Sequence, residues 1–484
     1  MTATATDSPV EGRAAGPAPD RVVIVGGSLA GLRAAEAVRS EGHTGRLTVI
    51  GDEPHEPYDR PPLSKAVLAG RLAADSTALP TPGELDAEWL LGTPAAGLDP
   101  AARHVALADG RRVEWDRLLI ATGTRARAWP DAAQARLDGV CTLRTREDAA
   151  ALRARLAAGP RRVLVIGAGF TGSEIASACR ELDLPVTVAE RSTAPLAGAL
   201  GGAAGSVAAQ VQREHGVDLR CNVTVLALEG DERGRVRRAR LSDGDVLDVD
   251  VVVVALGAVR NVEWLAGSGL AVDARGVVCD AACRVFSADA VVLDDVFVAG
   301  DVARWPHALY DGQLLAVEHW GNAVDQARTA AHNMVCPPSA RRAHTPLPAF
   351  WSDQFGLNIK AVGVPPYAEQ VVVTQGSVAE RRFAAAYGRG GRTVAAVTVN
   401  LPRALEAYAA LIEEGAPFPP VAHAADGPDP LAPVAAGLPG PGQPTHSAGA
   451  AATGPGPSAP AEPAHPAAVA AADPRTPPGP APLT

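Results

Sequence analysis

The chain contains very little lysine and few aromatic residues, and it has no long apolar run. Only Lys65 and Lys360 are lysines among its 44 basic residues, and aromatic residues make up 4% of the sequence. The apolar stretch VVVVALGAV, at residues 251–259, has the length of a strand, whereas a membrane-spanning helix needs about 20 apolar residues. We therefore expect a soluble chain in which lysine, unlike arginine, occurs for a specific chemical reason.

Cysteine is scarce, and its spacing excludes two classes of protein. The six residues are Cys141, Cys179, Cys221, Cys279, Cys283 and Cys336. They form neither the paired spacing of a zinc site nor the framework of a small disulfide-stabilised domain. Residues 1–20 lack the basic start and apolar run of a secretion signal. These features predict a cytoplasmic protein without a metal, and the net charge of −10 disfavours a general nucleic-acid binder.

Both ends of the chain differ in composition from the rest. Residues 1–20 are small, polar and acidic, and residues 419–484 are rich in alanine, proline and glycine. Such segments contain too few large apolar groups to offset the entropy lost on ordering. We expect both to be disordered.

A glycine-rich turn follows the first predicted strand. The sequence RVVIVGGSLAG, at residues 21–31, runs from an apolar strand into Gly26, Ser28 and Gly31, and helical spacing follows. A second strand then brings Asp52, which lies 21 residues beyond Gly31. In a dinucleotide-binding unit, the glycines let the backbone approach a pyrophosphate, the helix N-terminus stabilises its charge, and the acid binds ribose hydroxyls. Ser28 replaces the middle glycine with another small residue.

The same pattern recurs at residues 162–172, RVLVIGAGFTG, with all three glycines present. A helix and the strand PVTVAE follow, and the strand ends in Glu190, 18 residues beyond Gly172. A single pattern of this kind also occurs in unrelated sheets, but two in the same order predict two bound dinucleotides. The carboxylate of Glu190 can accept hydrogen bonds from ribose hydroxyls but repels a 2′-phosphate, although Arg191 offsets part of this repulsion.

Two further strands end in residues suited to a cofactor. The stretch DRLLIATG ends in Thr122 and Gly123, and DDVFVAGD ends in Gly300 and Asp301. Glycine allows the backbone to lie close to a ligand, and the carboxylate can bind a polyol chain. Taken alone, Asp301 is equally suited to capping a helix.

This order of motifs resembles that of the flavoproteins that bind two dinucleotides. The stretches GDEPHEPYDRPPLSK, GAGFTGSE, VEHWGNAVDQA and FWSDQFGLNIKAVG resemble more narrowly the ferredoxin reductases of bacterial oxygenase systems, the putidaredoxin reductase type, over residues 21–418. The resemblance implies an α/β fold with two Rossmann-like domains and a C-terminal α+β domain. FAD would occupy a discontinuous domain at 21–125 and 256–329, NADH the domain at 126–255, and residues 330–418 would help to form the acceptor face.

The motifs, together with this resemblance, predict two sets of binding residues. The FAD set is Gly26, Ser28, Ala30, Gly31, Asp52, Arg60, Lys65, Ala95, Thr122, Gly123, Arg144, Asp301 and Trp320. The NAD set is Gly167, Gly169, Phe170, Gly172, Glu174, Glu190, Arg191 and Gly257. Core packing is the alternative role for Trp320 and for Trp351. The histidines, including His307 and His319, are expected to be structural.

The resemblance also gives Lys65 a chemical role. In such enzymes this lysine lies beside the flavin and pairs with the acid two residues after the last glycine of the second motif, here Glu174. A compact ammonium can stabilise negative charge on the reduced ring while the acid holds it in place. We therefore predict that Lys65 and Glu174 are catalytic. The alternatives are a surface lysine after a Pro-Pro turn and an ordinary acid in the first turn of a helix.

The position of the cysteines bears on where the electrons go. The first one is Cys141, and no CxxC follows the second glycine-rich turn. Disulfide and peroxide reductases need a thiol beside the flavin, so the absence of one favours direct transfer from the flavin to an outside acceptor. The resemblance implies that this acceptor is a small iron-sulfur ferredoxin that serves an oxygenase, haem-containing or ring-hydroxylating. A rubredoxin reductase, a nitrite-reducing flavin module and a flavin protein of the apoptosis-inducing type stay open. For docking, we expect a cationic patch of Arg328, Arg341 and Arg342, the alternative being an ordinary solvated charge cluster.

Overall fold

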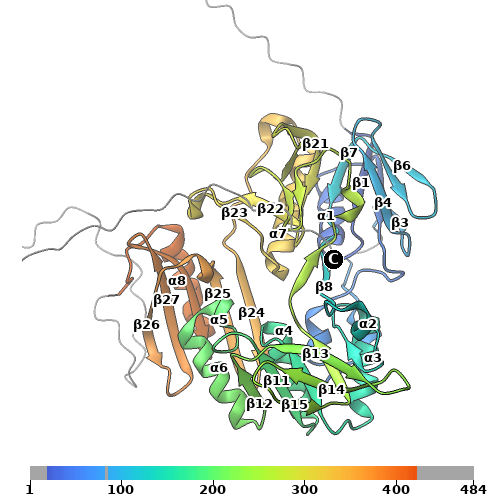
Figure 1. Cartoon of the computed structure of the whole chain (residues 1–484). Coiled ribbons are helices and arrows are strands. Elements are labelled where there is room, and N and C mark those ends of the chain that lie inside the picture. The colour runs from blue at the N-terminus through green and yellow to red at the C-terminus, as the bar shows by residue number, and fades with distance from the viewer. Residues whose placement is uncertain (1–18, 82–84, 422–484) are drawn as a thin grey trace, which may run out of the picture. The chain divides into compact units, whose positions relative to one another are not determined.

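The computed structural model describes residues 19–81 and 85–421 (Figure 1). The terminal segments expected to be disordered, 1–20 and 419–484, lie almost entirely outside these residues. Within the described ranges, no helix combines the length and the apolar character that a membrane crossing requires.

The first glycine-rich unit belongs to a six-stranded sheet with the order β20-β21-β7-β1-β2-β3. The strands are β1 (Arg21–Val25), β2 (Arg46–Ile50), β3 (Glu88–Leu90), β7 (Arg117–Ile120), β20 (Arg284–Phe286) and β21 (Val292–Val298). β1 pairs in parallel with β2 and β7, and β21 pairs in parallel with β7. One sheet therefore combines segments from both sides of the intervening second unit, as a discontinuous domain requires.

Helices α1 (Leu29–Ser40) and α7 (Trp320–Val335) pack against each other beside this sheet. Alanines dominate the apolar cluster that they share, among them Ala34 and Ala35 of α1 and Ala327 and Ala331 of α7. Small side chains let the two helix backbones approach closely. The close packing fixes the start of α7, which carries Trp320, relative to the start of α1.

The second glycine-rich unit forms a parallel five-stranded sheet with the order β12-β11-β10-β16-β9. Its strands are β9 (Val140–Cys141), β10 (Val163–Ile166), β11 (Val186–Glu190), β12 (Asp218–Cys221) and β16 (Val251–Val254). The helices of this part are α2 (Ala132–Ala135), α3 (Arg146–Ala157), α4 (Phe170–Glu181), α5 (Ala197–Leu200) and α6 (Gly202–Glu214). An antiparallel sheet of β13 (Val225–Gly230), β14 (Val236–Leu241) and β15 (Val246–Asp248) joins them.

The C-terminal part is an antiparallel sheet with the order β24-β25-β28-β27-β26. Its elements are β24 (Ala349–Gln354), β25 (Leu357–Gly363), β26 (Gln370–Ser377), β27 (Arg382–Arg389), β28 (Arg392–Val399) and α8 (Leu405–Glu413). Helix α8 covers one face through Tyr408 and Leu411. The opposite face, with Ile359 and Phe383, shares an apolar core with Ile175 of α4, and β24 packs directly on α4 (Figure 1).

The remaining strands of the described residues are short. They are β4 (Ala95–Asp99), β5 (His104–Leu107), β6 (Arg112–Glu114), β8 (Thr124–Ala126), β17 (Ala258–Arg260), β18 (Val272–Asp273), β19 (Gly276–Val278), β22 (Ala303–Pro306) and β23 (Leu314–Leu315). β8 and β17 pair antiparallel where the chain passes from one dinucleotide unit to the other and back. The expected domain boundaries at 125/126 and 255/256 fall within or just before this two-stranded ribbon.

Candidate active site

A cavity of about 610 Å³ lies at the carboxyl ends of the strands of the first sheet. Gly26 follows β1, Gly51 follows β2, Thr122 lies just after β7, and Gly300 lies just after β21; all but Gly51 belong to the predicted strand-end motifs. Open α/β sheets bind ligands at this edge. Of the predicted FAD set, every residue except Gly31 lines the cavity, and their roles as FAD ligands stay predictions.

The first glycine-rich turn is shaped by backbone contacts. Gly26 has a φ of +131°, and a Cβ added there would lie 2.1 Å from the carbonyl oxygen of Ala121. A Cβ on Gly31 would lie 1.8 Å from the carbonyl oxygen of Gly26. Ser28 is the N-cap of α1, but its hydroxyl makes no capping hydrogen bond. The first N–H groups of α1 therefore stay available to an anion such as a pyrophosphate.

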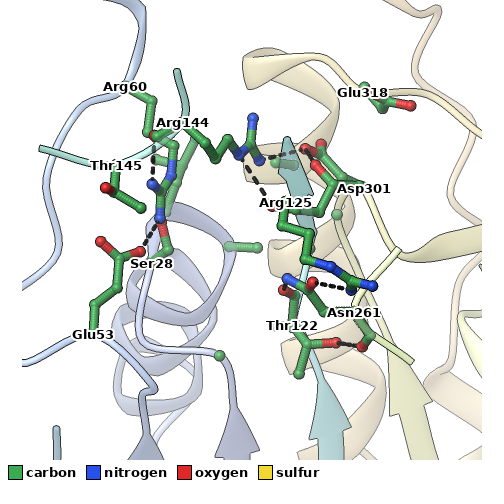
Figure 2. Close-up of a pocket in the computed structure, with 18 of the residues that line it drawn as sticks. Ser28, Glu53, Arg60, Thr122, Arg125, Arg144, Thr145, Asn261, Asp301 and Glu318 are labelled. Atoms are coloured by element: carbon green, nitrogen blue, oxygen red, sulfur yellow. Dashed lines mark hydrogen bonds and ion pairs between the residues drawn. The ribbon is translucent and has the colours of Figure 1, made fainter. Parts of the chain in front are cut away.

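Arg60 lies beside this helix start and is held from several sides (Figure 2). Its guanidinium pairs with Glu53 at 2.5 Å, donates to the Tyr58 hydroxyl at 2.8 Å and to the Arg144 carbonyl at 2.9 Å, and lies 3.4 Å from the Ser28 hydroxyl. A guanidinium fixed in this way holds a positive charge beside the helix start, where it can attract a phosphate. The sequence predicted Arg60 and Arg144 but gave no signal for Glu53.

Asp301 is bound on the opposite side of the cavity. Its carboxylate pairs with Arg144 at 3.1 Å and accepts a hydrogen bond from Thr124 at 3.3 Å (Figure 2). A turn and then β22 follow Asp301, so its alternative role as a helix cap is wrong. The pairing with Arg144 keeps the carboxylate oriented at the cavity wall.

Asn261 is a cavity residue that the sequence motifs missed. Its side-chain amide donates to the Thr122 carbonyl at 2.9 Å, and the Thr122 hydroxyl donates to the Asn261 carbonyl at 2.7 Å. Arg125 donates to the Asn261 side-chain oxygen at 2.9 Å (Figure 2). These hydrogen bonds join the segments next to β8 and β17, where the chain passes from one unit to the other and back, beside Gly123. No motif marks Asn261, because its position follows from the pairing of β8 with β17.

Lys65 and Glu174 form an ion pair of 2.7 Å, with side-chain exposures of 22% and 8%. Glu174 also accepts hydrogen bonds from the hydroxyls of Ser64, at 2.5 Å, and Ser352, at 2.6 Å. Lys65 and Glu174 line both the large cavity and a smaller one of about 240 Å³. The alternative of a freely solvated surface lysine is therefore wrong, while the catalytic roles of Lys65 and Glu174 stay predictions.

Aromatic side chains gather on one side of the large cavity. Trp320 donates to Asp59 at 2.9 Å, and its ring lies 6.2 Å from that of Trp351 in an edge-to-face arrangement. Trp351 is 43% exposed, so it is not a core aromatic. Phe170, at the start of α4, packs edge-to-face on Phe350 at 4.7 Å. Burial raises the pKa of the Asp59 carboxyl above its ordinary value.

His319 lines the same cavity, although the sequence suggested only a structural role. Its Nδ1 is buried without a hydrogen-bond partner among the described residues, and its ring packs at 4.9 Å on that of Phe350. Burial lowers the pKa of His319 to about 4, so the ring is neutral near pH 7. His307, by contrast, lies away from the cavity and faces the Pro346 carbonyl at 3.3 Å.

The predicted NAD residues lie mostly along the carboxyl edge of the second sheet. Both carboxylate oxygens of Glu190 accept backbone N–H groups at 2.7 Å, from Ala168 and from Ser192. Arg191 is exposed. Of the NAD set, only Phe170 and Glu174 also line the large cavity. The remaining members of the set are Gly167, Gly169, Gly172 and Gly257, which lie in the turns after β10 and β16 or at the start of α4.

The cysteines are separate from the cavity and chemically quiet. All six are free thiols, and none lines the large cavity. Burial raises the pKa of every one of them above its ordinary value, to about 12 for Cys179. A reactive thiol needs a lowered pKa. Within the described ranges, no cluster of histidine, cysteine and acidic residues could hold a metal ion.

Known proteins share this architecture. Residues 20–327 match the family described as pyridine nucleotide-disulphide oxidoreductase, and residues 349–435 match the family described as reductase C-terminal. Rhodocoxin reductase of Rhodococcus erythropolis is 36% identical over 385 residues, which cover 79% of this chain and 87% of the relative. Putidaredoxin reductase of Pseudomonas putida is 34% identical over 416 residues, covering 83% and 94%.

A solved structure is also similar to this chain. The covalent putidaredoxin reductase–putidaredoxin complex has a TM-score of 0.76 and 31% identity, and the match covers 83% of this chain and 94% of the solved one. These matches confirm the fold class and the resemblance inferred from the motifs. The chain belongs to the pyridine nucleotide-disulphide oxidoreductase family.

Proposed function

We propose that this protein oxidises NADH and passes the electrons through FAD to a small iron-sulfur ferredoxin that serves an oxygenase. The observation that carries the proposal is the Lys65–Glu174 pair at the wall of a large cavity that no cysteine of the described chain lines. Relatives named as ferredoxin–NAD(+) reductase components of dioxygenase systems support it, as does the solved complex of putidaredoxin reductase with putidaredoxin.

The cavity residues fit FAD. The open start of α1 and the fixed guanidinium of Arg60 would hold the pyrophosphate, and Asp301 would bind the polyol chain. Neutral His319 adds no positive charge beside Asp301. When bound, FAD supplies the change from two-electron hydride chemistry to single-electron release.

The residues around Lys65 would prepare the site for NADH. The ammonium places a positive charge at the cavity wall, where it would stabilise the negative charge that develops when hydride arrives. Glu174 fixes that ammonium, and Phe170 lies where α4 begins, between the second glycine-rich turn and the cavity.

The six free thiols with raised pKa argue against a disulfide reductase and favour a reducing cytoplasm.

NADH is expected to be preferred over NADPH by about 100-fold in kcat/KM. The carboxylate of Glu190 is fixed by two backbone N–H groups and cannot swing away from a 2′-phosphate. Like charges about 4 Å apart repel by roughly 4 kcal/mol at an effective dielectric of about 20, and solvent exposure reduces this value. Steady-state kinetics with both nucleotides measure the ratio. Glu190→Gln should reduce it, and an Arg191→Ala variant should increase it. A ratio near one in the unmodified protein would contradict the assignment.

The predicted cationic docking patch needs correction. The Arg341 side chain is 8% exposed, pairs with Asp294 at 2.6 Å and lies over the ring of Phe297, so its assignment to a solvated patch is wrong. Arg328 remains 60% exposed, and Arg342 is exposed. Neutralising Arg341 would therefore damage the structure rather than report on docking.

Trp351→Ala is expected to slow ferredoxin reduction by about 30-fold, since an exposed aromatic side chain at the centre of a docking face can contribute about 2 kcal/mol. NADH–ferricyanide turnover should fall much less than ferredoxin reduction, because a small oxidant needs no docked protein surface. Val371→Ala is the matched control, since Val371 is 44% exposed and lies on β26, at the other edge of the same sheet. Equal loss with both acceptors would mean structural damage.

The function itself is tested in two steps. Anaerobic stopped-flow mixing of the FAD-loaded protein with NADH should bleach the oxidised flavin within the dead time or within seconds. Cytochrome c reduction is then measured with and without each member of a panel of ferredoxins and a rubredoxin. Slow bleaching accompanied by a change in oligomeric state would favour a flavin protein of the apoptosis-inducing type. Stimulation by rubredoxin alone would identify rubredoxin, rather than a ferredoxin, as the electron acceptor.

A further inference from the structure

Ser352 of β24 donates a hydrogen bond to Glu174 Oε1, and the surrounding contacts show that Ser352 is the donor in this bond. The side chain is fully buried, and its oxygen accepts a hydrogen bond from Gln354 Nε2 at 3.1 Å. A carboxylate can only accept, so the single hydroxyl hydrogen of Ser352 is committed to Glu174. The C-terminal sheet therefore holds one oxygen of the acid.

The other oxygen of Glu174 is held from a different part of the chain. Oε2 accepts a hydrogen bond from Ser64 and pairs with Lys65, and both residues lie at the end of the 3₁₀ turn Pro61–Ser64. Lys65 Nζ also lies 3.3 Å from the Pro61 carbonyl. With Oε2 alone bound, the carboxylate could rotate about its last bond. Ser352 supplies the second fixed point that sets its plane.

We propose that Ser352 is a positioning residue: it orients Glu174 so that the carboxylate keeps the Lys65 ammonium at the wall of the large cavity. The C-terminal sheet would then take part in the reaction with NADH as well as in forming an acceptor face. The effect on NADH chemistry rests on the proposed function, whereas the effect on Lys65 itself does not.

Ser177 provides a matched control within the same interface. Like Glu174, Ser177 lies on α4 and is buried, and it accepts a hydrogen bond from the Phe355 N–H at 2.8 Å. Ser177→Ala therefore removes one hydrogen bond between α4 and the C-terminal sheet without removing any ligand of Glu174. Ser352→Ala removes the hydrogen bond that ends on Glu174, together with the one that Ser352 accepts from Gln354.

Selective amine labelling followed by mass spectrometry can read the state of Lys65 directly. Lys360 is the only other lysine of the chain and serves as an internal reference in each molecule. In FAD-loaded Ser352→Ala protein we expect the ratio of Lys65 labelling to Lys360 labelling to rise by a factor between about three and ten. The upper limit is the effect that one lost hydrogen bond to a charged group can give. In Ser177→Ala protein the ratio should stay unchanged.

Stopped-flow reduction by NADH gives a second readout. Ser352→Ala should slow the limiting rate of flavin reduction by about tenfold, because a small displacement of a group at the reaction site lowers the rate. The NADH concentration that gives half of this rate should change by less than about twofold. Ser177→Ala should leave both values near those of the unmodified protein. If Ser352→Ala loses FAD, Ser352→Cys, which keeps a side chain of similar shape but replaces the hydroxyl by a much weaker donor, is judged by the same labelling ratio.

The labelling ratio decides the proposal. A ratio in Ser352→Ala that matches Ser177→Ala overturns it, whatever the NADH rates are, and so does an unchanged ratio in Ser352→Cys where that variant is needed. Failure of NADH to reduce the unmodified protein would instead count against the proposed function, and the labelling result would still be readable.

Discussion

Replacing Lys65 with methionine is expected to slow flavin reduction by NADH by about 100-fold, the usual effect of removing one preorganised group that stabilises developing charge. The ammonium is the cation that pairs with Glu174, 2.7 Å away, and it lines the large cavity. Anaerobic stopped-flow kinetics at saturating NADH measure the limiting rate. Lys65→Arg should recover only part of it, because the larger planar guanidinium cannot occupy the same position.

Lys360→Met is the control for this prediction. It removes the other lysine, which lies on β25 and does not line the large cavity, and it should leave the rate of flavin reduction within about twofold of the original. A rate for Lys65→Met that matches Lys360→Met would contradict the assignment of Lys65 to the reaction.

Stability separates a chemical role of Lys65 from a structural one. Lys65→Met leaves the 8% exposed carboxylate of Glu174 without its cation, and breaking such a pair typically costs about 3 to 5 kcal/mol. Because Ser64 and Ser352 still donate to the carboxylate, we expect a loss near the lower limit. The double variant with Lys65→Met and Glu174→Gln should regain most of the stability. It should remain slow with NADH.

The sequence predicted the fold class well because each dinucleotide unit is encoded locally. Strand, glycine-rich turn, helix and strand follow one another within about 30 residues, and backbone contacts require glycine at positions such as Gly26 and Gly31. The alternation of buried strands with helices then predicts parallel sheets, which the structure contains.

The contact of Glu174 with Ser352 could not be predicted in this way, unlike the pairing with Lys65 that the resemblance implied. Ser352 lies 178 residues further along the chain, and no local pattern indicates that it faces α4. The pairing of β24 with β25 decides the matter, because neighbouring residues on a strand point to opposite faces. Trp351 is therefore exposed while Ser352 is fully buried against Glu174.

Arg341 failed as a docking residue for a similar reason. Its charge is visible in the sequence, but its ion pair is with Asp294, 47 residues earlier. An arginine buried at such a contact looks the same in the sequence as one on a solvated surface. The partner of a charge therefore has to be known before the charge can be assigned to docking.

Two glycines of the second motif differ in whether the fold or a ligand requires them. In the second glycine-rich turn, a Cβ on Gly172 would lie 2.0 Å from the Gly167 carbonyl oxygen, whereas a Cβ on Gly169 would meet no atom within 4 Å. Gly172→Ala must displace backbone, so we expect a loss of about 3 kcal/mol or more in the free energy of unfolding. Gly169 begins α4 as its N-cap, and alanine there should cost less than about 1 kcal/mol.

The effect on NADH should run in the opposite order. Gly169→Ala should retain FAD and the original melting temperature to within a few degrees, yet raise the KM for NADH by about tenfold or more, because the added methyl group occupies the space that a pyrophosphate needs at the helix start. Thermal unfolding and NADH titration of the two variants test both halves. Since Ser28 occupies the matching position in the first turn, a serine at Gly169 should be tolerated by the fold as well. An unchanged KM in Gly169→Ala would mean that NADH does not approach this turn, and the assignment of the second unit to the nucleotide would fail.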